Sequence, residues 1–118
     1  MSDYFELTAE LNDSMQKAWS DLDESKQAGI RASEARAAYR AAMSIEIINL
    51  RANSKLPANL IPKVAEGSER VNELALQYDI SEVLYKASCE AVQLRKRQVD
   101  ILREQIARED RTPRRENL

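Results

Sequence analysis

The chain has 118 residues, of which 32% are charged and only 5% are aromatic, and its net charge is −2. This length predicts a single domain, and the richness in alanine, glutamate, arginine and leucine is typical of long amphipathic helices. Without histidine, and with one cysteine and two glycines, the chain lacks the usual general base, zinc ligands and nucleotide-binding loops, so we expect no enzyme and no cofactor or metal.

No apolar run approaches the roughly 20 residues needed to cross a bilayer, and the Met-Ser-Asp start lacks the pattern of a signal peptide. The lone Cys89 cannot form an intrachain disulfide, and we expect it to be a small, buried helix residue. These features predict a soluble, cytoplasmic protein with no membrane partner.

The first long segment, about residues 5–53, contains no proline and predicts one long helix. Its first half has a narrow apolar stripe at alternating spacings of three and four, made up of Tyr4, Leu7, Leu11, Met15, Ala18 and Leu22. Beyond Ala35 the segment is apolar on most faces, so we expect that half to be enclosed. Gly29 lies where the two halves meet and is expected to weaken or bend the helix.

The chain's only cluster of proline and glycine lies between Leu56 and Gly67, and it predicts the point where the chain reverses. A short helix fits within this stretch, with Asn59 as its N-cap, Pro62 in its first turn and Gly67 at its end. We therefore predict an all-α fold, namely a long, coiled-coil-like antiparallel helical hairpin with a short helix at the turn.

The last segment, about residues 68–109, predicts the second long helix. Ser68 is a suitable N-cap, and an alternative start is Asp79, which forms a capping-box pattern with Glu82. Apolar residues recur there at intervals of seven, with Leu102 beside the row: Val71, Tyr78, Tyr85, Val92, Val99, Leu102 and Ile106.

Adjoining rows on the same helix add a second set of apolar side chains, Ile80, Leu84, Ala87, Ala91, Leu94 and Ile101. Together the rows cover an arc of roughly 160°, which is wider than a contact between two helices requires. We therefore expect the chain to form a homo-oligomer, and we assign the row of seven residues that begins at Val71 to its interface.

Acidic residues outnumber basic ones before Ala32, whereas basic residues outnumber acidic ones after Tyr85. An antiparallel hairpin places these two stretches side by side, so the segregation favours internal charge complementarity. The residues that could instead bind a phosphate backbone, partly from a flexible basic tail at 111–118, are Arg95, Lys96, Arg97, Arg111, Arg114 and Arg115. No aromatic residue lies among them to stack on a base, so a nucleic-acid partner is the less favoured alternative.

Trp19 lies one residue away from the apolar stripe of the first helix, which predicts partial exposure and a candidate contact for a partner protein. Tyr39, Tyr78 and Tyr85 fall in the densest apolar region, where we expect them to be core residues. A third possibility is a pocket between the helices that uses these tyrosines and either Arg40 or Arg36 to sequester a small nucleotide or similar anion.

Five segments carry a resemblance to known proteins: Leu56–Gly67, Val71–Leu74, Asp79–Glu82, Tyr85–Ala87 and Ile106–Glu109. Across about residues 35–110 the chain resembles small all-helical proteins of unassigned function from phage and prophage genomes. The resemblance implies a phage-type accessory protein in a bacterial host, either associated with replication or recombination or inhibiting a host or defence protein. Our leading hypothesis is a non-enzymatic protein that presents helical surface to a partner protein and to itself.

Overall fold

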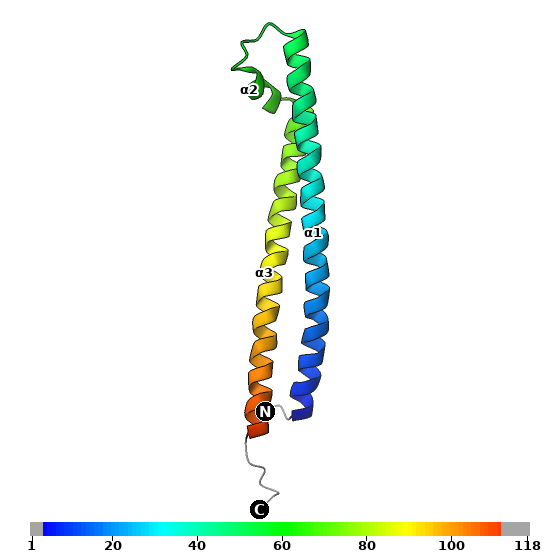
Figure 1. Cartoon of the computed structure of the whole chain (residues 1–118), viewed down its shortest axis with the longest axis vertical. Helices are drawn as coiled ribbons and strands as arrows, with labels where there is room; N and C mark the ends of the chain where they lie inside the picture. Colours follow the sequence, from blue (N-terminus) through cyan, green and yellow to red (C-terminus); the bar gives the residue numbers. More distant parts are fainter. Residues whose placement is uncertain (1–3, 112–118) are drawn as a thin grey trace, which may run out of the picture. The chain divides into compact units, whose positions relative to one another are not determined.

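The structure is a computed structural model and describes residues 4–111. Two long helices, α1 (Tyr4–Asn53) and α3 (Glu69–Arg111), pack against each other, and the short helix α2 (Ile61–Glu66) lies between them in the chain (Figure 1). Residues 4–111 contain no strand. The predicted all-α hairpin is thereby confirmed, and the predicted tail beyond Arg111 lies outside the described residues.

The chain divides into two compact units, and both long helices run through both of them. The described part of the first, which we call the terminal unit, consists of residues 4–25 of α1 and 87–111 of α3. The second, the turn unit, consists of residues 26–86 and includes α2. Between residues 4 and 111 neither long helix has a stretch that is long and apolar enough to span a membrane.

In the turn unit, the chain reverses where the prolines predict it. The backbone N–H of Leu60 donates to the carbonyl of Pro57 (3.0 Å), and α2 then begins at Ile61 with proline in its first turn. The predicted N-cap Asn59 is wrong, because Leu60 is the capping residue and no side chain caps the helix. Gly67 ends α2 as predicted.

The start of α3 also follows one of the two predicted alternatives. The Ser68 hydroxyl accepts a hydrogen bond from the backbone N–H of Val71 (3.3 Å), which satisfies one of the free donors at the start of a helix. The alternative start at Asp79 is wrong, because α3 is already continuous from Glu69.

The core of the turn unit joins small side chains of α1 to larger ones of α3. Its buried apolar residues are Ala28, Ala32, Ile61, Ala65, Val71 and Leu74. Two tyrosine rings of α3 show how closely the helices approach. The rings of Tyr39 and Tyr78 stack with their centroids 6.3 Å apart, and a Cβ atom on Gly29 would lie 3.1 Å from Cε1 of Tyr85. Gly29 therefore provides space for a ring, and α1 continues as a helix through it.

The expectation that the second half of α1 is enclosed is wrong for the single chain. Ile45 and Ile48 are 61% and 63% exposed, and the alanines of that half that are also exposed are Ala37, Ala38, Ala41 and Ala52. The physical reason is geometric, since one neighbouring long helix covers only one stripe of α1. The outward side of the turn unit is therefore markedly apolar.

The terminal unit has a narrower and more polar core. On α1, positions that are buried or half-buried recur at alternating spacings of four and three: Leu7, Leu11, Ser14, Ala18, Asp21 and Ser25. On α3 the buried apolar residues are Val92, Val99 and Leu102. The predicted stripe of α1 is thus correct for its leucines, Met15 and Ala18, but it omits two buried serines, and Tyr4 is exposed.

Candidate functional site

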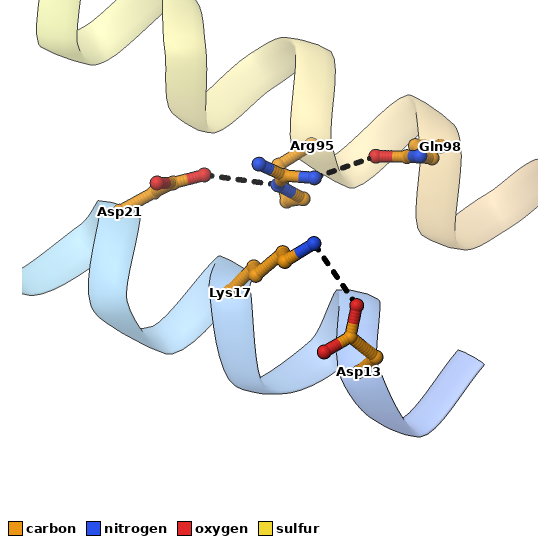
Figure 2. Close-up of polar contacts among 5 residues, drawn as sticks. All are labelled: Asp13, Lys17, Asp21, Arg95 and Gln98. Carbon is orange, nitrogen blue, oxygen red and sulfur yellow. Dashed lines mark hydrogen bonds and ion pairs between the residues drawn. The ribbon is translucent and has the colours of Figure 1, made fainter. Parts of the chain in front are cut away.

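A charge-assisted hydrogen bond joins the two helices of the terminal unit. The Nε atom of Arg95 donates to Oδ2 of Asp21 at 3.0 Å, and Nη1 of Arg95 donates to Oε1 of Gln98 at 2.8 Å (Figure 2). Both charged side chains are only about a quarter exposed, at 27% and 28%. The predicted complementarity between the acidic and basic stretches is therefore present at this pair, where water screens the charges less than at the surface.

A second ion pair in Figure 2 runs along α1. Lys17 Nζ lies 3.0 Å from Oδ2 of Asp13, four residues earlier on the same helix, and both side chains are more than half exposed. This local pairing turns Lys17 toward Asp13 and leaves Asp21 to Arg95. The two adjacent pairs therefore offer a direct comparison between a half-buried contact across the helices and an exposed contact within one.

The three consecutive basic residues of α3 face different surroundings. Successive residues of a helix point about 100° apart, so Arg95, Lys96 and Arg97 cannot form one flat patch. Arg95 meets Asp21, Lys96 lines a groove beside Trp19, and Arg97 lines a separate hollow of α3. Of the other predicted phosphate-binding residues, Arg111 ends α3, whereas Arg114 and Arg115 lie outside the described residues.

A groove lies beside Trp19 in the terminal unit. We call it the Trp19 groove; it has a volume of about 340 Å³ and is lined by Met15, Ala18 and Trp19 from α1 and by Lys96, Val99, Asp100 and Arg103 from α3. Trp19 is 70% exposed, so the prediction that it is partly exposed is confirmed. Val99 is buried, and the rim carries two cationic side chains and one carboxylate.

Local sequence explains how the Trp19 groove forms. Met15 and Trp19 are four residues apart and so stand on the same side of α1, next to the stripe that faces α3. On α3, Lys96, Asp100 and Arg103 follow each other at spacings of four and three, which aligns them along one edge. The fold therefore brings an indole ring, a thioether and two cations to one open surface.

Most of the row that we assigned to an oligomer interface lies within the hairpin. Val71, Val92, Val99 and Leu102 are buried in the single chain. Tyr78 and Ile106 are half-buried, and Tyr85 is 36% exposed. A surface for a second copy therefore has to use other residues, and the adjoining apolar rows remain exposed, with Ile80, Leu84, Leu94 and Ile101 each at least half exposed.

Cys89 and two of the three tyrosines contact side chains of the opposite long helix. Cys89 is half-buried and not fully buried as we expected, and its sulfur lies 3.5 Å from the hydroxyl of Ser25 across the two helices. The stacked Tyr39 and Tyr78 belong to the turn unit and line neither the Trp19 groove nor the hollow at Arg97. Within residues 4–111, no group of three or more acidic or cysteine side chains is arranged to hold a metal ion.

Comparison with protein-family models, with curated proteins and with solved structures finds no match to this chain. The geometry of the chain itself is thus the basis for any functional proposal. The Trp19 groove could not be recognised from either helix alone, because its two walls are more than 70 residues apart in sequence. Two features of the sequence could have pointed to the groove. Trp19 lies beside the apolar stripe of the first helix, and the proline-marked turn sets which residues of α3 lie opposite it.

Proposed function

We propose that this chain is a non-enzymatic interaction protein that presents helical surface to a partner protein and to a second copy of itself. The observation that supports this function best is the exposed indole of Trp19, set beside an apolar groove with cationic residues on its rim. Tryptophan, methionine and arginine are enriched at protein interfaces, where a large side chain anchors the contact and charges orient it.

The lining of the Trp19 groove defines the chemistry of the partner. Its contact segment places an apolar side chain against Trp19 and Val99, and a carboxylate within reach of Lys96 or Arg103. Asp100 lies between these two cations in sequence, so a partner with a single, well-placed carboxylate fits better than a dense polyanion. The interaction takes place in the cytoplasm, and inhibition of a host or defence protein by a phage-type chain is one setting for it.

A nucleic-acid role is the second candidate, and one specific observation favours it. The sequence offers no aromatic residue among its arginines, but the fold brings Trp19 beside Lys96 and Arg103, which together could stack a base and contact a phosphate. The acidic residues on this stretch of α1, among them Asp13, Asp21 and Glu24, oppose a phosphate backbone. We therefore rank a protein partner first.

Site-specific photocrosslinking in bacterial cells tests the proposed function. A photoreactive amino acid replaces Trp19 in one version of the chain and Ser20 in a matched control, because both positions are exposed and successive helix positions point about 100° apart. We expect a discrete crosslinked protein from position 19 only, and its loss in the Lys96→Glu/Arg103→Glu variant. Crosslinks of equal yield from both positions, or none from position 19, would contradict the proposal.

A further inference from the structure

The outward flank of α3 in the terminal unit carries a second row with the spacing of a helix contact. Its members follow each other at intervals of four, three, four and three, and all are exposed: Ala87, Ala91, Leu94, Gln98 and Ile101. Leu94 and Lys96 are two residues apart and therefore about 160° apart around the helix, which separates this row from the Trp19 groove. Leu94 is 64% exposed, so its side chain is available for contact.

A shallow hollow lies beside Leu94. It has a volume of about 360 Å³ and is lined by Cys89, Glu90, Gln93, Leu94 and Arg97. Residues four apart form ridges on a helix surface, and a second helix packs by setting its own ridges into the grooves between them. The hollow between the Glu90–Leu94 ridge and the Cys89–Gln93–Arg97 ridge has this form.

Two opposite charges bracket Leu94 at the hollow. Glu90 and Arg97 are seven residues apart, which on a helix is two turns or roughly 10 Å, whereas paired side chains on one helix are three or four residues apart. The two charges are thus too far apart along α3 to satisfy each other. Neither residue belongs to the ion pairs that the described part of α3 forms, so both charges are available to another helix.

We propose that a second copy of this chain covers the flank, with the two α3 helices antiparallel about a twofold axis near Leu94. Leu94 of each copy then packs on Ala91 of the other, so a large side chain meets a small one twice. In the same register Glu90 lies opposite Arg97 of the second copy, and Arg97 lies opposite Glu90 of the second copy. A twofold contact repeats every pairing in this way, which makes the patch complementary to itself.

The charges also favour the antiparallel arrangement over a parallel one. In a parallel pair the same residues of the two copies stand at the same level, so Arg97 has no Glu90 opposite it. The antiparallel arrangement rests on the proposed function for the premise that the chain self-associates, and it specifies the residues and orientation involved. It does not involve the Trp19 groove, so the two ideas can fail separately.

Sedimentation equilibrium of the full chain tests the arrangement by charge reversal. We expect the wild-type chain to be a dimer at micromolar concentration. Glu90→Arg alone and Arg97→Glu alone each place two pairs of like charges across the axis, which should weaken dimerisation about tenfold. The double variant Glu90→Arg/Arg97→Glu recreates both pairs with reversed sign and should return the dissociation constant to near the wild-type value.

Three further substitutions show whether the effect is specific to this flank. Leu94→Glu should yield a folded monomer with an unchanged helical circular dichroism spectrum, because the side chain is exposed within the single chain. As matched controls, Asp13→Lys and Lys17→Asp reverse an exposed pair on α1 and should leave the dimer unchanged.

The outcome also separates this inference from the proposed function. A wild-type chain that stays monomeric at high micromolar concentration, or a double variant that dimerises no better than the single variants, would overturn the antiparallel pairing. A dimer that responds to the charge reversals as expected supports it, including when position 19 gives no crosslink and only the Trp19 proposal fails.

Discussion

At the scale of single residues, Arg95 shows how one position can serve the fold although its neighbours in sequence suggest another role. It stands in a run of three basic residues, yet its guanidinium is held by Asp21 and Gln98. A charge-assisted hydrogen bond that is mostly shielded from water is stronger than an exposed ion pair, and it leaves an unpaired charge behind when one partner is removed. Arg95 is therefore a structural residue of the terminal unit.

A double-mutant cycle on Asp21→Ala and Arg95→Ala measures this contact. We expect a coupling free energy of about 1 kcal/mol in urea unfolding, since both side chains are largely covered. The exposed pair Asp13 and Lys17 serves as the control, and its coupling should not exceed about 0.5 kcal/mol. Equal couplings for the two pairs would show that the cross-helix bond has no special role.

Gly29 illustrates what sequence reasoning could not reach at this scale. From its residue type alone we expected a weakened or bent helix, because glycine lowers helix stability. The structure instead places the ring of Tyr85 where a side chain at position 29 would stand. That neighbour is more than 50 residues away in sequence, so no local pattern around Gly29 could reveal it.

At the scale of the elements, the turn and the start of α3 were the features that the sequence predicted best. Proline, glycine and capping residues act locally, so the turn between Leu56 and Gly67 and the start of α3 after Ser68 could be inferred from neighbouring residues alone. The inward face of α3 was harder to assign. Two apolar rows of α3 have spacings suited to a helix contact. Only the fold shows that the row with Val71 and Val92 faces inward.

The cap at Ser68 gives a quantitative expectation for α3. Ser68→Ala removes the acceptor for the Val71 backbone N–H and should lower the free energy of unfolding by about 1 kcal/mol, as measured in urea. Ser81→Ala is the matched control in the middle of the same helix, where the hydroxyl only donates back to the Gln77 carbonyl. The control should cause no loss of stability, because alanine favours helix. If both variants lose the same amount, the cap is not the cause.

At the scale of the whole molecule, residues 4–111 bury few apolar side chains and expose many. Large apolar side chains that are exposed on the two units include Trp19, Leu94, Ile48 and Val83. Exposed apolar side chains that recur at helical spacing are typical of surfaces that contact other proteins. Two such surfaces in the terminal unit differ in chemistry, since the Trp19 groove has a mixed cationic rim and the flank at Leu94 is complementary to itself.

The central claim, that the Trp19 groove receives a partner protein, is tested most directly by fluorine NMR. Trp19 is the only tryptophan, so a chain labelled with fluorotryptophan gives one signal from the groove without background from other proteins. On addition of extract from bacterial cells, we predict a shifted or broadened signal for the wild-type chain and an unchanged one for Lys96→Glu/Arg103→Glu. A sharp, unshifted wild-type signal, or a salt-sensitive shift produced by purified DNA alone, would contradict the account.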